Sequence, residues 1–183
     1  MARVLILLAN GFEELEAITV MDLLSRANIE FLRASLDKGY VTAAHHTVLV
    51  PDCTLDEVMG NDFDLIVIPG GKAGVEHLIE DHRVTKVIHQ QVQQDKMTAA
   101  ICAGPAVLVK AEVTDDKTIT CYPGALDGID LGSTSLSNES VVIDWPLITS
   151  RGPGTAIEFS LQLIECLSGA KVRERVRASL AGD

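Results

Sequence analysis

The sequence lacks a basic surplus. It has 15 Lys and Arg residues against 26 Asp and Glu residues, which gives a formal net charge of -11 at pH 7. Nucleic acids and anionic membrane surfaces are bound through clustered basic side chains, so we expect neither as a main partner. The apolar run 3–9 is too short to span a bilayer, and the acidic stretch 10–14 is a poor signal-peptide cleavage region. These absences predict a cytoplasmic protein.

Closely spaced cysteines are also missing. The chain has four cysteines, none in a Cys-x-x-Cys pair: Cys53, Cys102, Cys121 and Cys166. In a reducing cytoplasm such cysteines are expected to be free thiols rather than a disulfide framework. We predict a structural role for three of them and treat Cys102 separately below.

The histidines do not form a recognisable ligand set. His45 and His46 are adjacent, so on a strand their side chains would point to opposite faces. His77, His82 and His89 lack the i, i+4 spacing of a helical metal site, and we expect them to face solvent. The sequence therefore predicts no metal ion and no organic cofactor.

What the chain does have is an alternation of strand-like and helix-like segments over its whole length. This alternation predicts one doubly wound α/β domain, residues 1–183, with a mostly parallel central sheet and helices on both faces. We expect a hairpin or an extended arm at 41–50 and a helix cap at Thr54. The expected strands are 3–9, 29–36, 64–68, 98–101, 117–121, 133–136, 140–143 and 147–149, and the expected helices are 13–27, 74–94, 106–110, 156–167 and 171–180.

Cys102 lies where a buried strand turns sharply into a helix. Pro105 suits the first helical turn, and Ala103 and Gly104 leave room for a reactant to approach the backbone. A cysteine at a helix N-terminus is expected to have a lowered pKa, and the N–H groups of the turn are suited to hold an oxyanion. The pattern is that of a nucleophile elbow. The alternative is a buried cysteine that fills space between strand and helix.

Three other turns should lie at the same edge of the sheet, because parallel strands end together. They are 11–16, 70–71 and 122–124. Gly70 and Gly71 are suited to present backbone N–H groups to a reacting atom, although paired glycines also form ordinary tight turns. The glutamates of 13–16 are favoured by the helix dipole in any case, but a carboxyl directed over the strand ends would be a partner for Cys102.

Four segments carry a resemblance to a known family: 11–16, 64–71, 99–105 and 147–155. With these motifs in order, the chain resembles the ThiJ/PfpI superfamily in its DJ-one-like branch, which includes the parkinsonism-associated deglycase and its bacterial relatives. The resemblance implies a flavodoxin-like sandwich, a homodimer and no cofactor. It implies a nucleophile at Cys102, a partner carboxyl at Glu16, oxyanion contacts from the N–H groups of Gly71 and Ala103, and substrate or anion contacts at Gly70, Tyr122, Arg26 and Arg151.

The same resemblance implies two kinds of function. One is a cysteine-dependent glyoxalase or deglycase that acts on methylglyoxal, glyoxal or early glycation adducts and releases lactate or glycolate. The other is a redox sensor or chaperone whose reactive cysteine oxidises to sulfinic acid. Hydrolysis or hydration in the manner of the peptidase and isonitrile-hydratase relatives is disfavoured, because Ala103 stands where the peptidases often have a histidine.

Three positions depart from the family pattern. Tyr122 replaces a histidine that many members have after the next strand, which removes an obvious general base. His45 replaces an expected arginine, which weakens an anion site near the dimer interface. Val50 stands where the human protein has a peripheral cysteine.

Overall fold

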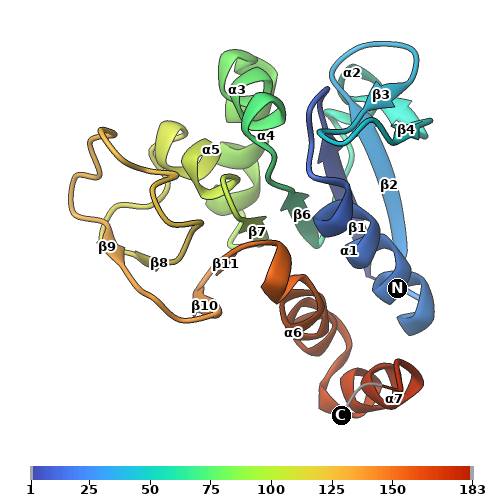
Figure 1. Ribbon diagram of the computed structural model, residues 1–183. Helices are drawn as coiled ribbons and strands as arrows, with labels where there is room; N and C mark the ends of the chain where they lie inside the picture. Colours follow the sequence, from blue (N-terminus) through green and yellow to red (C-terminus); the bar gives the residue numbers. More distant parts are fainter. Residues whose placement is uncertain (1, 182–183) are drawn as a thin grey trace.

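The fold is built on a seven-stranded sheet with the order β10-β11-β7-β6-β1-β2-β5 (Figure 1). The computed structural model describes residues 2–181. Neighbouring strands are parallel except at one edge, where β10 is antiparallel to β11. The predicted α/β class with a mostly parallel sheet is confirmed. The strands are β1 (Arg3–Leu8), β2 (Glu30–Ser35), β5 (Cys53–Thr54), β6 (Leu65–Ile68), β7 (Met97–Ile101), β10 (Val141–Asp144) and β11 (Leu147–Ser150).

Helices cover both faces of this sheet (Figure 1). Along β1, Val4, Ile6 and Leu8 face one core, whereas Leu5 and Leu7 face the other. Successive side chains of a strand point to opposite faces, so a strand covered on both sides needs a continuous apolar run. The first core includes α1 (Glu14–Ala27), α6 (Ala156–Ser168) and α7 (Ala170–Ser179), and the second includes α2 (Leu55–Val58), α3 (Lys72–Glu80), α4 (His82–Gln93) and α5 (Pro105–Lys110).

The helix expected at 74–94 is two helices. It starts earlier, at Lys72, and is interrupted at Asp81, whose backbone is extended (φ -90, ψ 108). The Asp81 carboxylate accepts a hydrogen bond of 2.9 Å from the Arg83 N–H and so caps α4. Aspartate is a strong N-cap residue, and this local signal outweighs the helical periodicity across it.

The segment 117–121 was expected to be a strand of the central sheet, and that prediction is wrong. β8 (Thr118–Ile119) pairs instead with β9 (Ser135–Leu136) in a separate two-stranded sheet. The chain still returns to the main sheet, because the Thr120 N–H donates to Thr149 Oγ1 at 2.9 Å. The hairpin of β3 (Val41–Thr42) and β4 (Val48–Leu49) is confirmed, and η1 (Pro153–Thr155) precedes α6.

No helix among residues 2–181 is long and apolar enough to cross a membrane.

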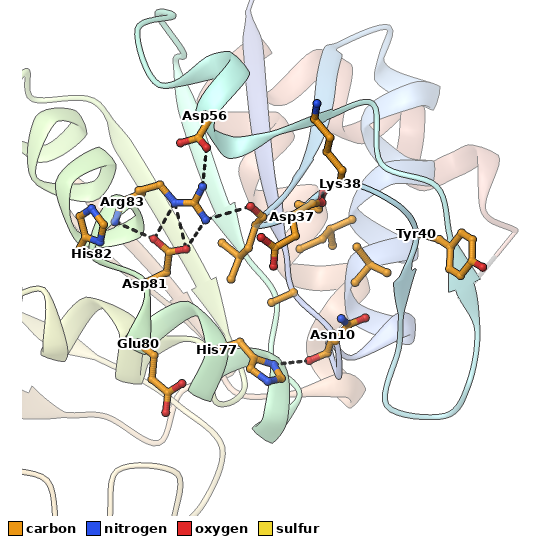
Figure 2. Close-up of a pocket in the computed structure, with 15 residues that line it drawn as sticks. Asn10, Asp37, Lys38, Tyr40, Asp56, His77, Glu80, Asp81, His82 and Arg83 are labelled. Carbon is orange, nitrogen blue, oxygen red and sulfur yellow. Dashed lines mark hydrogen bonds and ion pairs between the residues drawn. The ribbon is translucent and has the colours of Figure 1, made fainter.

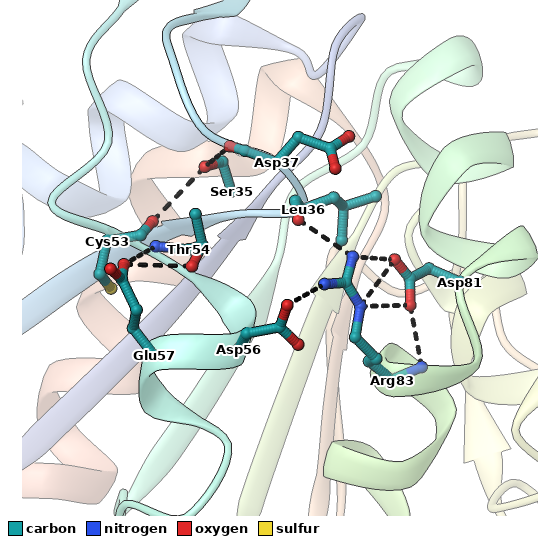
Figure 3. A network of polar contacts seen from close by, with 9 residues as sticks. All are labelled: Ser35, Leu36, Asp37, Cys53, Thr54, Asp56, Glu57, Asp81 and Arg83. Atoms are coloured by element: carbon teal, nitrogen blue, oxygen red, sulfur yellow. Dashed lines mark hydrogen bonds and ion pairs between the residues drawn. The ribbon is translucent and has the colours of Figure 1, made fainter.

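Arg83 joins three elements on the α3–α4 side of the sheet (Figure 3). Its guanidinium contacts Asp81 at 2.5 Å, Asp56 of α2 at 2.8 Å and the carbonyl oxygen of Leu36, just after β2, at 3.0 Å. Beside this network, the Thr54 N–H donates to Glu57 at 2.7 Å, which confirms Thr54 as the cap of α2. The Arg83 side chain is only 19% exposed, so these partners, rather than water, stabilise its positive charge.

We expect Arg83→Met to lower the free energy of unfolding by about 1–3 kcal/mol, because Asp81 and the Leu36 carbonyl would lose their partner while the apolar stem is kept. Asp56→Asn is the matched control. Its carboxylate is 66% exposed, and exposed ion pairs contribute less than about 1 kcal/mol. Urea unfolding measures both changes, and equal losses would contradict the special role of the Asp81 and Leu36 contacts.

Candidate active site

Cys102 occupies a strained turn between β7 and α5. Its φ is +64, in the left-handed region that non-glycine residues rarely adopt. Two backbone hydrogen bonds hold this conformation: the Cys102 N–H donates to the Ser150 carbonyl at 3.0 Å, and the Tyr122 N–H donates to the Cys102 carbonyl at 2.8 Å. The half-buried thiol is thereby fixed at the carboxyl edge of the sheet, as the elbow prediction required.

Gly70 lies between the Cys102 thiol and the Glu16 carboxyl. A Cβ at Gly70 would be 2.6 Å from Cys102 Cβ, 2.7 Å from Glu16 Oε2 and 3.0 Å from Cys102 Sγ. The Glu16 side chain is fully buried, and its Oε2 accepts a 2.7 Å hydrogen bond from the Gly70 N–H. Its Oε1 is buried without a fixed partner among residues 2–181. The Glu16 carboxyl also hydrogen-bonds the Cys102 side chain, so the two acids can exchange a proton.

The two predicted oxyanion donors also meet at the sulfur. The N–H groups of Ala103 and Gly71 both hydrogen-bond Cys102. Gly71 has φ +90, and a Cβ there would be 2.2 Å from the Gly11 carbonyl oxygen, so only glycine fits. Charge that develops on or beside the sulfur is thus met by two backbone dipoles.

The expected lowering of the Cys102 pKa is wrong. Burial, together with the charge of Glu16, raises the pKa of Cys102 to about 12, although the two N–H donors oppose this. Burial likewise raises the pKa of Glu16 to about 7. The helix after the elbow has only six residues, and desolvation outweighs its dipole. The pair therefore holds one shared proton between about pH 7 and about pH 12.

Two of the three remaining predicted contact residues, Tyr122 and Arg151, lie beside Gly152, whereas Arg26 lies in the last turn of α1. The Tyr122 side chain is 50% exposed, and it lies so close to Gly152 that a Cβ there would be 3.1 Å from its ring. Arg151, which directly precedes Gly152, donates to Asn138 Oδ1 at 3.0 Å. Arg26 lies in the last turn of α1, where it pairs with Asp22 at 2.7 Å. The structure does not bring Arg26 to Cys102.

Sequence reasoning missed a second polar cluster at the start of α1. Glu14 accepts hydrogen bonds from the His45 N–H at 3.1 Å and contacts His45 Nδ1 at 3.1 Å. Burial raises the pKa of Glu14, but hydrogen bonds from its own backbone and from His45 outweigh this and lower the pKa to about 2. His45 lies in a turn rather than on a strand, so its pairing with a glutamate 31 residues away had no local signal.

Two of the remaining histidines contact backbone carbonyl oxygens through the ring. His82 is exposed, as expected. His77 is exposed but contacts the Asn10 carbonyl oxygen at 2.9 Å through Nδ1. His89 is half-buried, because its Nε2 lies 2.5 Å from the Ala111 carbonyl oxygen, so the expectation that it faces solvent is wrong.

A cavity of about 610 Å³ lies near the ends of β1 and β2 (Figure 2). It is not the elbow site, because Cys102 and Glu16 are not among its lining residues. The loop at Gly11 packs on α3 nearby, where a Cβ on Gly11 would be 2.6 Å from Ala73 Cβ. The cavity is lined by Leu8, Ala9, Asn10, Ser35, Leu36, Asp37, Lys38, Tyr40, Val41, Asp56, His77, Glu80, Asp81, His82 and Arg83.

We expect alkylation of Cys102 by iodoacetamide to be slow at pH 7 and to accelerate as the pH rises toward about 12, because Glu16 loses its proton first and its charge then holds the second proton on the sulfur. In Glu16→Gln, the thiol pKa should fall from about 12, because the neighbouring charge is gone. Mass spectrometry of the Cys102 peptide, with the exposed Cys166 as internal control, measures both rates. A wild-type rate that already rises through about pH 7 would contradict this order and place the shared proton on Glu16.

Comparison with known proteins identifies the family of this chain. The family model described as DJ-1/PfpI family matches residues 2–166. The chain is 36% identical over 181 residues to the Parkinson disease protein 7 homolog of Danio rerio, covering 97% of this chain and 96% of that protein. It is 36% identical over 157 residues to the glutathione-independent glyoxalase DJR-1.2 of Caenorhabditis elegans, covering 86% of this chain and 83% of that protein. The crystal structure of Drosophila melanogaster DJ-1beta superposes with a TM-score of 0.95 at 36% identity, covering 100% of this chain and 98% of that one. The resemblance drawn from the motifs is confirmed: the chain belongs to the DJ-1/PfpI family.

Proposed function

We propose that this protein is a cofactor-independent glyoxalase or deglycase that uses Cys102 as a covalent nucleophile on small reactive carbonyl compounds. The carrying observation is the arrangement around Gly70, where a buried carboxyl and a half-buried thiol lie against the same glycine with one proton to share. The likeness to a glutathione-independent glyoxalase of Caenorhabditis elegans supports this reaction class. Methylglyoxal and glyoxal are the proposed substrates, with early glycation adducts as a wider group.

The reaction begins at the aldehyde carbon of methylglyoxal. The Cys102 sulfur bonds to this carbon while the carbonyl π bond breaks, and the N–H groups of Gly71 and Ala103 hold the oxygen that becomes negative. Glu16 gives its proton to that oxygen, and a hemithioacetal results. The electron pair of the broken π bond therefore ends in the new O–H bond, and Glu16 is left as a carboxylate.

Glu16 then acts as a base. Its carboxylate removes the hydrogen from the former aldehyde carbon, the C–H electron pair forms a carbon–carbon double bond, and the ketone oxygen takes the hydroxyl proton of the first carbon. Glu16 then returns its proton to the former ketone carbon, and the oxygen on the first carbon re-forms a carbonyl. The first carbon is thereby oxidised to a thioester while the ketone carbon is reduced to an alcohol, so no external oxidant is needed. Water cleaves the thioester, which releases lactate and restores Cys102. Glyoxal gives glycolate by the same steps.

Other parts of the site have supporting roles in this proposal. Tyr122 and Arg151 line the edge beyond the sulfur, and Gly70 leaves the space in which the carbonyl carbon approaches. The protein is proposed to work as a cytoplasmic homodimer. Arg26, in the last turn of α1, is assigned no contact with the substrate of its own chain.

We expect lactate formation from methylglyoxal to fall more than about 100-fold in Cys102→Ser and in Glu16→Gln, because each removes a group that makes or breaks a bond. Cys166→Ser is the matched control, since this thiol is exposed on α6, and it should retain the wild-type rate. Lactate is measured directly after removal of glyoxalase contaminants. Activity that survives Cys102→Ser would end the covalent mechanism.

A second function is favoured by the same half-buried sulfur beside a carboxyl whose pKa is raised to about 7. Two equivalents of peroxide would oxidise the Cys102 thiol to a sulfinic acid with release of two water molecules, and Glu16 would hydrogen-bond the product. A wild-type protein that forms no lactate, but gains two oxygens selectively at Cys102 under mild peroxide, would identify a redox sensor rather than a glyoxalase.

A further inference from the structure

Three ligand-type side chains converge at the rim where α1 begins. Glu13 is the N-cap of α1 and Glu14 is its first residue, whereas His45 belongs to the loop between β3 and β4. His45 Nδ1 lies 3.1 Å from Glu14 Oε2 and 3.7 Å from Glu13 Oε1. One ligand atom from each residue lies within 4.8 Å of both others.

These spacings match those around a tetrahedral divalent ion. Zn²⁺ binds imidazole nitrogen and carboxylate oxygen at about 2.0–2.2 Å, so two such ligands in a tetrahedral site are about 3.4 Å apart. The observed separations from Nδ1 lie on either side of that value. Glu14 is also fixed in place, because the His45 N–H donates to both of its carboxylate oxygens at 3.1 Å.

His45 is the one basic side chain within ion-pair distance of these two carboxylates among residues 2–181. Both glutamate side chains are only 15% exposed, and within residues 2–181 neither contacts a lysine or an arginine. An arginine at position 45 would carry a permanent charge between them, whereas a neutral imidazole carries none but is a good metal ligand. In the single chain His45 is 73% exposed, which leaves room for an ion and for a water molecule as fourth ligand.

We propose that Glu13, Glu14 and His45 bind a divalent transition-metal ion of the Zn²⁺ type, with one position open to water. The bound ion joins the β3–β4 hairpin to the start of α1, two segments that are 31 residues apart in the chain at His45 and Glu14. Because the ion binds the folded arrangement of these segments, it stabilises the native state against unfolding. The proposal does not rest on the chemistry proposed for Cys102.

Zn²⁺ titration of the metal-free protein tests the site, with calorimetry and thermal unfolding as readouts. The parent protein carries Cys102→Ser, so that the reactive sulfur does not compete for the ion. His45→Arg removes the ligand but supplies a cation for both carboxylates, so it should unfold at the same or a higher temperature without metal. His46→Asn is the matched control, because His46 has φ +70 and asparagine tolerates that backbone.

We expect one saturable Zn²⁺ site in the parent, at least tenfold weaker binding in His45→Arg and in Glu14→Gln, and less than a twofold change in His46→Asn. Co²⁺ bound at the same site should show no thiolate charge-transfer band. The proposal is overturned by the absence of saturable binding, by undiminished binding in His45→Arg, by equal loss in His46→Asn, or by a thiolate band from one of the remaining cysteines.

Discussion

The shared proton of Glu16 and Cys102 is the constraint on which the site depends. A fully buried carboxyl is costly to ionise, and a thiolate beside it would add a second negative charge. The structure resolves this by letting the pair keep one proton and by directing the N–H groups of Gly70, Gly71 and Ala103 at the two acids. The charge that remains after one proton is lost is therefore solvated by the protein itself.

The parallel sheet supplies this arrangement through its register. Ile68 of β6 pairs with Ala100 of β7, so the chain two residues further on places Gly70 opposite Cys102. On the other side of β6, β1 leads into α1, whose first turn carries Glu16. Three consecutive strand ends thus contribute a carboxyl, a glycine and a thiol to one point. A slip of one residue in either pairing would turn these groups to opposite faces.

Much of this could be predicted from the sequence because the signals are local. Each turn follows a continuous apolar run, and parallel strands that end together bring their turns together. The signal for the helix break at Asp81 is also local, because this aspartate ends α3 and caps α4. The helical periodicity of the apolar residues continues across it, and this hid the break. The displacement of 117–121 from the main sheet was not local, since it depends on pairing between β8 and β9.

The electrostatics could not be predicted for a different reason. A helix N-terminus next to Cys102 indicated a lowered pKa, but the sequence does not state how deeply Glu16 is buried or that it faces the sulfur. Desolvation and a like charge act over a few ångströms, so their effect depends on the final packing of segments far apart in the chain. The same holds for His45, which meets Glu14 only once the hairpin folds over α1.

Position 122 shows how a departure from the family pattern can leave the site intact. The Tyr122 backbone N–H donates a hydrogen bond to the Cys102 carbonyl and so helps to hold the strained backbone of Cys102. Any residue except proline can donate this hydrogen bond. The Tyr122 side chain meanwhile lies against Gly152. Among the groups that shift the Cys102 pKa, Glu16 is the one ionisable side chain. Proton transfer at the sulfur therefore falls to a carboxyl whose raised pKa of about 7 lets it act as acid and as base near neutral pH, without a histidine.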